Sequence, residues 1–185
     1  MKIFALYLRL NLINKPKWFD DFRLKYDEPF DLHVTLIQPR YIDEARVDDL
    51  KFIVSKFLSE NRFSEEDRII EFNNLVFDQE LDGSYTIMLL AQKANKIFEL
   101  QNCLRELLKE FNEYVKNVTI EYEENFKPHI TIGRNIKSDL LLEAKSYFKP
   151  NFSVKGILAD LVLPIVMNTS AEERKNPKNL TILDL

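Results

Sequence analysis

Apolar residues along the chain follow two spacings, one typical of strands and one typical of helices. Short runs rich in β-branched and aromatic residues predict strands. Longer segments whose apolar residues recur every three or four positions predict amphipathic helices. The predicted strands cover residues 3–10, 32–39 (ending at Pro39), 69–79, 84–92, 118–123, 129–134, 152–164 and 180–185, and the predicted helices cover residues 16–26, 43–59, 94–115 and 138–148.

Turn signals separate these elements without marking a domain boundary. Asp82-Gly83 lies between two predicted strands and is a strong signal for a β-hairpin. The polar run 167–179 is interpreted as a solvent-exposed loop, with a lid as the alternative. The blocks strand–helix–strand–helix and hairpin–helix–strand–helix are loosely parallel, which indicates a weak internal duplication. The sequence therefore predicts an α+β protein with one domain, residues 1–185.

Composition and charge narrow the class of ligand. In 185 residues, 45% hydrophobic and 12% aromatic content supports a packed core. The formal net charge of −4 argues against a broad surface for extended duplex DNA, so a nucleic-acid ligand would need a local basic cleft. Three glycines are too few for a glycine-rich phosphate loop or a dinucleotide fingerprint. A small nucleotide or an RNA end fits these limits better.

Cysteine usage and the N-terminal segment indicate where the protein works. A single cysteine, Cys103, cannot form an internal disulfide, which points to a reducing compartment. Cys103 falls in the apolar register of the helix at 94–115 and is interpreted as a core residue. The N-terminal run MKIFALYLRLN is too short to span a bilayer and lacks a clean cleavage site. We therefore expect a cytoplasmic protein without a membrane partner.

One short phrase occurs twice, and it uses the only two histidines of the chain. FDLHVTL occupies residues 30–36, and FKPHITI occupies residues 126–132. On a strand, residues two apart project from the same face. Each phrase therefore presents an imidazole beside a threonine hydroxyl, while the aliphatic residues between them point to the opposite, core-facing side.

The two phrases are interpreted as one chemical site. Two ordinary strands with hydrogen-bonded His and Thr are one alternative, and a metal site is another, although two histidines are too few for structural zinc. Metal-independent phosphodiester cleavage fits better, because a base and an acid must act on opposite sides of phosphorus. An imidazole with a pKa near 6.5 can fill either role. Threonine hydroxyls can donate to the oxygens where charge develops.

The phrases resemble the paired His-x-Thr-x motifs of the 2H phosphoesterase superfamily. This group includes the RNA 2′,3′-cyclic phosphodiesterases, also called 2′-5′ RNA ligases. HVTL and PHITIGR carry the resemblance, and the second is the closer match because Pro128 precedes the histidine and Arg134 follows it. The resemblance implies a bilobal fold of two pseudo-symmetric lobes, each with an antiparallel sheet flanked by helices, and a cleft between them.

The same resemblance implies the reaction and the residues that perform it. His33 and His129 would be catalytic, and Thr35 and Thr131 would bind the substrate phosphate. In the family's scheme the first histidine protonates the departing ribose oxygen and the second activates water, but near-symmetry leaves the two roles interchangeable at this stage. The implied reaction opens the 2′,3′-cyclic phosphate of a nucleotide or RNA terminus to a 2′-phosphomonoester and uses no cofactor or metal.

Four further residues are candidate substrate contacts. Lys127 shares the strand parity of the second histidine, and Arg134 follows the second motif on the opposite parity unless the chain turns. Arg40 and Tyr41 follow the first motif and could line the mouth of the cleft, where Tyr41 could stack on a base. Ordinary surface positions are the alternative for all four.

One departure from the family pattern leaves the substrate open. After the first motif the RNA phosphodiesterases tend to continue with a Phe-Leu-Gly-like segment, whereas this chain has IQPR. Related proteins act on cyclic ADP-ribose phosphates, 2′-5′ oligoadenylates or RNA 3′ ends. Two other functions stay open as well: a nucleotide- or RNA-binding module without useful turnover, and a 2′-5′ RNA ligase.

Overall fold

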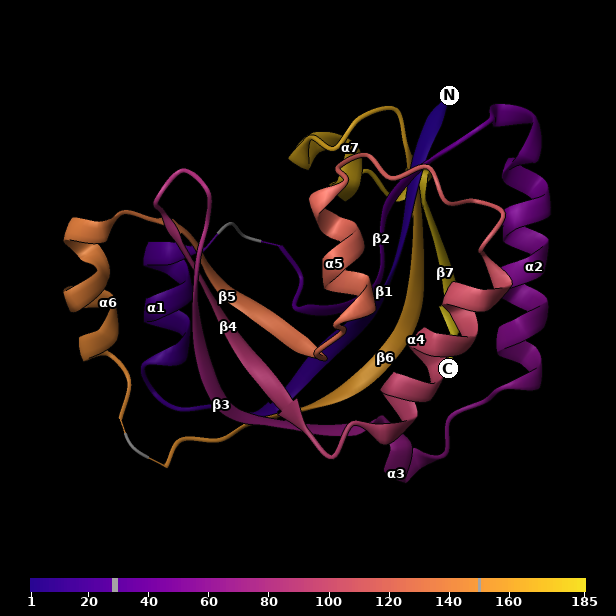
Figure 1. Ribbon diagram of the computed structural model, residues 1–185. Coiled ribbons are helices and arrows are strands. Elements are labelled where there is room, and N and C mark those ends of the chain that lie inside the picture. Colours follow the sequence, from indigo (N-terminus) through magenta and orange to yellow (C-terminus); the bar gives the residue numbers. More distant parts are fainter. Residues whose placement is uncertain (28–29, 150) are drawn as a thin grey trace.

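The protein combines one antiparallel sheet with helices on its outer sides (Figure 1). The computed structural model describes residues 1–27, 30–149 and 151–185. Its strands are β1 (Lys2–Asn14), β2 (His33–Ile42), β3 (Ile69–Gln79), β4 (Tyr85–Gln92), β5 (His129–Ile136), β6 (Val154–Val166) and β7 (Leu180–Asp184). Its α-helices are α1 (Phe19–Tyr26), α2 (Val47–Glu60), α3 (Glu65–Arg68), α4 (Asn95–Leu107), α5 (Val118–Glu124), α6 (Leu141–Ser146) and α7 (Ala171–Lys175), with 3₁₀ turns at Glu44–Arg46, Ser138–Leu140 and Pro177–Asn179. The predicted α+β class is confirmed.

The order of the strands places the two His-x-Thr strands at opposite ends of the sheet. The path runs β2-β1-β6-β3-β4-β5. The long strand β6 pairs with β1 along one side, and with β3 and then β7 along the other. It thereby joins the antiparallel strands of both lobes into one continuous sheet. Because β2 and β5 nevertheless contact each other, the sheet curls until its two ends meet.

The hairpin between β3 and β4 follows the predicted turn. The two strands pair from Glu71↔Gln92 to Gln79↔Tyr85. Gly83 adopts φ +81°, a left-handed conformation that glycine adopts without steric cost. The hairpin prediction at Asp82-Gly83 is confirmed.

Each half of the sheet is covered by a helix that comes from the other half of the chain. The helix α1 follows β1 in the chain but contacts β5, whereas α4 follows β4 but contacts β2. Figure 1 shows α1 and α6 beside β3, β4 and β5, and α2 and α4 beside the remaining strands. Gly133 permits the close approach of α1, because a Cβ at this position would lie 3.2 Å from Cε1 of Phe22. The exchange of helices holds the two motif strands together.

Aromatic side chains form the core of the half that contains β5. Trp18 and Phe22, from the start of α1, contact Phe148 at ring-centroid distances of 4.8 and 4.9 Å. Tyr147 and Phe152 complete the group. Buried rings contribute much of the apolar area that stabilises a small domain, so this cluster fixes α1 to the segment after α6.

The predicted helix at 94–115 is wrong beyond Leu107, and the predicted strand at 118–123 is wrong throughout. After α4 the backbone turns, and the N–H of Val115 donates to the carbonyl of Pro39 at the edge of β2. Residues 118–124 form α5, although their β-branched residues favour a strand. Tertiary contacts decide both cases, because α5 brings the buried carboxylate of Glu123 to Arg40.

Three smaller expectations also need correction. The strand β2 continues through Pro39 to Ile42, because the proline lies at a sheet edge, where a missing N–H is tolerated. Cys103 is exposed, since the buried side of α4 is formed by residues on either side of it. The run 167–179 contains α7 and a 3₁₀ turn rather than an irregular loop. Among the residues that the structure describes, no helix is both long and apolar enough to cross a membrane.

Candidate active site

The two histidines are held in the same way at the starts of β2 and β5. Nδ1 of His33 lies 2.7 Å from the carbonyl oxygen of Asp31, and Nδ1 of His129 lies 2.7 Å from the carbonyl oxygen of Lys127. A carbonyl oxygen can only accept, so Nδ1 must carry the proton and donate it. In both rings Nε2 is therefore the nitrogen that can take up or release a proton, and the ring orientation is fixed.

A β-bulge in β5 directs Arg134 to the side of the sheet that carries the histidine. Thr131 pairs with Met88, but Gly133 pairs with Ile87, so Ile132 is an extra residue in the strand. Such a bulge reverses the alternation of side chains that follow it. Arg134 consequently shares the face of Thr131, contrary to the simple parity expected from sequence.

The same bulge occurs in β2 and brings a glutamine to the equivalent place. Thr35 pairs with Tyr7, but Ile37 pairs with Leu6, so Leu36 is the extra residue. Gln38 therefore lies five residues after its histidine on the same face, as Arg134 does in β5. The duplicated motifs thus end differently, in an amide on one strand and in a guanidinium on the other.

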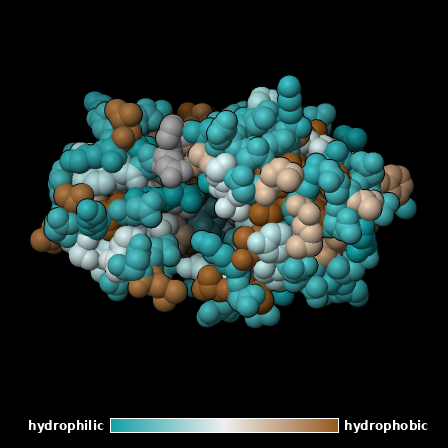
Figure 2. All heavy atoms as spheres, turned by 90° about the horizontal axis from the view of Figure 1, so that it is seen from above, coloured by the Kyte–Doolittle hydropathy of each residue, from teal (hydrophilic) through white to brown (hydrophobic). Residues whose placement is uncertain are grey.

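The first motif opens into a cavity of about 550 Å³. Figure 2 views the molecule from above and shows a hollow in the middle of the face seen there, bounded largely by hydrophilic side chains. The lining residues are Ala5, Tyr7, Phe30, Asp31, His33, Thr35, Gln38, Pro39, Val115, Lys116, Thr119, Arg134, Pro164, Thr169, Arg174, Lys175 and Leu180. Four of these side chains are basic and one is a carboxylate, so the cavity is a local cationic site in an acidic protein.

The second motif adjoins this cavity through Arg134. Within the described part of the chain, His129 and Thr131 are not among the lining residues. The charge of His129 nevertheless acts on His33, and that of Arg134 acts on both rings, so all three groups share one electrostatic neighbourhood. The contact between β2 and β5 is what brings the two motifs together.

Three of the four candidate contacts do not line the cavity. The side chain of Lys127 is exposed, whereas its backbone carbonyl accepts the hydrogen bond from Nδ1 of His129. Tyr41 is partly buried, and its N–H donates to the carbonyl of Glu113. Arg40 is buried away from solvent. Only Arg134 lies where a substrate contact was predicted.

Arg40 holds the scaffold behind the cavity instead. Its guanidinium lies 2.5 Å from a carboxylate oxygen of Glu123 and donates to the carbonyls of Leu108 and Phe111 at the end of α4. The other carboxylate oxygen of Glu123 accepts the N–H of Gln38 at 2.6 Å. This buried network ties α4 and α5 to the segment of β2 that follows the first motif.

Burial lowers the pKa of both imidazoles below the usual value of about 6.5. The positive charge of Arg134 lowers both further, whereas the hydrogen bonds to the backbone carbonyls act in the opposite direction. The charge of Arg174 lowers the pKa of His33 further, whereas the carboxylate of Asp78 opposes part of the lowering at His129. The two rings are therefore similar in geometry but differ in their surrounding charges.

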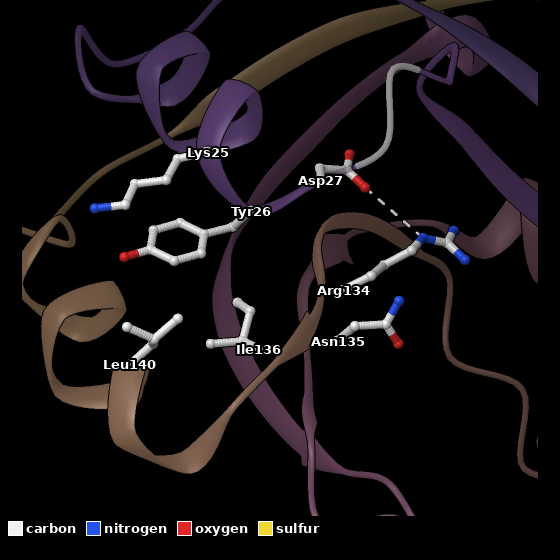
Figure 3. Close-up of a pocket in the computed structure, with 7 residues that line it drawn as sticks. All are labelled: Lys25, Tyr26, Asp27, Arg134, Asn135, Ile136 and Leu140. Carbon is white, nitrogen blue, oxygen red and sulfur yellow. Dashed lines mark ion pairs between the residues drawn. The ribbon is translucent and has the colours of Figure 1, made fainter.

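Arg134 is fixed from behind by a carboxylate. The two side chains meet at one edge of a second cavity of about 320 Å³, where Nε of Arg134 lies 3.7 Å from Asp27 (Figure 3). Asp27 also pairs with Arg23 of α1 at 2.9 Å. Its carboxylate therefore links the helix to the guanidinium whose charge lowers the pKa of both histidines.

Several cavity residues carry no motif and were missed by the sequence prediction. Tyr7 packs against His33 with a ring-centroid distance of 4.8 Å and the rings tilted by 51°, and alternation along β1 could have placed it there. Lys116, Arg174 and Lys175 come from segments whose sequences show only ordinary polar residues. Among the described residues, no cluster of three or more His, Cys, Asp or Glu side chains could hold a metal ion.

An α+β fold in which two His-x-Thr strands meet beside a cationic cavity is that of a 2H phosphoesterase. Within that class, the chain belongs to the 2′-5′ RNA ligase superfamily, whose family model matches residues 13–163. No curated protein matches the chain. The family assignment therefore rests on this model and on the fold.

Solved structures of Usb1 share the fold at low sequence identity. Usb1 from Kluyveromyces marxianus is 13% identical, with 99% of this chain and 98% of that chain covered and a TM-score of 0.55. Its structure with uridine monophosphate is 12% identical, with the same coverage and TM-score. E. coli LigT complexed with 3′-AMP is 16% identical, with 97% and 95% covered and a TM-score of 0.45.

Proposed function

We propose that this protein is a metal-independent cyclic phosphodiesterase that hydrolyses 2′,3′-cyclic phosphates of nucleotides or RNA termini to 2′-phosphomonoesters. The observation that carries the proposal is the equivalent anchoring of the two imidazoles. Each donates from Nδ1 to the carbonyl two residues earlier, which leaves Nε2 for proton transfer. The cationic cavity beside them suits a phosphate, and Usb1 with uridine monophosphate supports a nucleotide as the ligand class.

In this reaction one imidazole acts as base and the other as acid. The base removes a proton from water while the water oxygen bonds to phosphorus. The bond from phosphorus to the 3′ oxygen of the ribose breaks, and the acid gives its proton to that oxygen. One water is consumed, and a 2′-phosphomonoester with a 3′ hydroxyl is formed. No electrons are exchanged, so the step requires no redox partner.

The groups beside the histidines would stabilise the phosphorane-like transition state. Thr35 and Thr131 share a strand face with their histidines and can donate to non-bridging oxygens. Arg134 can offset the growing negative charge from a position that acts on both rings. We propose these three as phosphate contacts.

The proposal is tested by hydrolysis in the presence of EDTA. The purified protein should convert adenosine 2′,3′-cyclic phosphate, or a short RNA with a cyclic phosphate end, to the 2′-phosphomonoester. Chromatography against both isomeric standards identifies the product. Saturable binding of these compounds without any product would instead indicate a binding module, and turnover that EDTA abolishes would contradict metal independence.

The pH dependence should follow the lowered pKa values of the imidazoles. The active form carries one proton on the two rings, and kcat/KM reports the free enzyme. Because both pKa values are lowered, that form is populated at more acidic pH, and kcat/KM should peak below the ordinary histidine pKa of about 6.5. Activity should then fall as the pH rises above the optimum, because the acid loses its proton.

Proton NMR can check the same prediction without substrate. The chain has only two histidines, so every imidazole resonance comes from the site. Both imidazoles should titrate below the ordinary histidine pKa, because both are buried and Arg134 acts on both. Arg134→Gln should raise both midpoints. Midpoints above about 6.5 would contradict the lowered pKa values, and a flat rate profile between roughly pH 5 and 9 would contradict the pairing of acid and base.

A further inference from the structure

The segment between β6 and β7 is an ordered arm beside the cavity. The side chain of Ser170 accepts the N–H of Glu173 at the start of α7. The carboxylate of Glu173 accepts the N–H of Met167 at 3.0 Å and a side-chain N–H of Asn179 at 3.2 Å. These bonds close the arm on itself, so the two residues that follow Glu173 are presented from a fixed backbone.

Those two residues are basic, and both lie over one aromatic ring in the cavity wall. The guanidinium of Arg174 is 4.5 Å from the ring centroid of Phe30, and the ammonium of Lys175 is 4.6 Å from it. Cation–π contacts at such distances restrict long cationic side chains without neutralising them. Both cationic side chains also line the cavity.

This arrangement breaks the symmetry of the duplicated motifs. Phe30 and Phe126 each precede a motif histidine by three residues. Phe126 packs edge-on against Phe98 at 5.6 Å, whereas Phe30 carries the two cations. Lys116, just before α5, is a third basic residue in the lining, and α5 contacts β2. Three of the four Lys and Arg side chains that line the cavity therefore lie on the β2 side.

We propose that Arg174, Lys175 and Lys116 form a second phosphate subsite, which binds the phosphate on the 5′ oxygen of the ribose whose 2′,3′-cyclic phosphate lies at the histidines. This inference rests on the proposed function for the identity of the reacting group. Arg174 and Lys175 lie beyond residues 13–163, which the family model matches, whereas Lys116 lies within them.

The charge distribution favours a second phosphate over additional contacts to the first. Arg134 acts on both histidines, whereas Arg174 acts on His33, so Arg134 is the cation proposed to serve the reacting phosphate. A nucleotide carries its 5′ phosphate at the other side of the ribose from the cyclic phosphate. The cavity of about 550 Å³ falls in the range of small-molecule sites and accommodates both groups.

The test measures binding of product analogues by calorimetry. The ligands are adenosine 2′-phosphate, adenosine 2′,5′-bisphosphate and the dinucleotide ApA with a terminal 2′-phosphate. Wild type should bind each of the last two about tenfold to a hundredfold more tightly than the first. The double variant Arg174→Gln/Lys175→Gln should reduce that ratio to within about threefold, while Lys178→Gln, an exposed lysine of the same arm, should preserve it.

Each outcome decides the point. Equal affinity of wild type for the three ligands, or an unchanged ratio in the double variant, would overturn the subsite even if the enzyme hydrolyses cyclic phosphates. A ratio that depends on Arg174 and Lys175 supports the subsite even if no cyclic phosphate is hydrolysed, and only the proposed function would then fail. Preference for the bisphosphate alone identifies a mononucleotide as the ligand, whereas preference for both compounds identifies an RNA end. Thermal melting of each variant verifies that it is folded.

Discussion

Replacing either motif histidine by alanine should lower kcat/KM for a 2′,3′-cyclic phosphate by about 10²–10⁴-fold. His33→Ala removes one proton-transfer group and His129→Ala removes the other, so each leaves a site that can perform half of the required chemistry. The double variant should lose little more than either single variant, because base and acid act as a unit. Steady-state kinetics of the four proteins at the optimal pH would measure this.

Asparagine variants provide the matched control for the orientation of the ring. The amide nitrogen of Asn lies near the place of imidazole Nδ1, so His33→Asn can still donate to the carbonyl of Asp31 while lacking Nε2. His129→Asn does the same at Lys127. Activity as low as in the alanine variants, with wild-type stability, would assign the loss to Nε2. Losses that multiply in the double variant would show that the histidines act independently.

The motif itself could be predicted from sequence because it depends on local geometry alone. Alternation along a strand places a histidine and a threonine two residues apart on one face, and apolar neighbours specify which face is buried. His33 and Thr35 lie in the cavity as this rule requires. The rule failed at Arg134, because the bulge at Ile132 adds a residue that the pattern of side chains does not reveal.

Contacts between distant segments could not be predicted in the same way. The helix α5 has the β-branched residues of a strand, and only its buried carboxylate, paired with Arg40 of β2, explains its conformation. Arg174 and Lys175 occupy an unremarkable polar run, and their role becomes visible when the arm lies against Phe30. Local pattern thus identified the reacting groups, whereas the surroundings that tune them depend on tertiary packing.

The buried pair between Arg40 and Glu123 should be the most sensitive point of the scaffold. Glu123→Ala removes the counter-charge of a buried guanidinium and the acceptor of the Gln38 N–H. Breaking a buried ion pair by removing one partner costs about 3–5 kcal/mol, because the remaining charge stays uncompensated. We expect this loss in the free energy of unfolding, measured by urea denaturation with an unchanged m-value.

A surface ion pair in the same region serves as the control for the effect of burial on this prediction. Arg46 and Glu110 lie 2.6 Å apart but are both solvent-exposed, so Glu110→Ala should cost no more than about 1 kcal/mol. Glu123→Gln should fall between the two, because the amide oxygen can still accept the N–H of Gln38 but carries no charge. Equal small losses for Glu123→Ala and Glu110→Ala would show that burial does not govern the Arg40 pair. In that case α5 would be held against β2 by its apolar contacts rather than by Glu123.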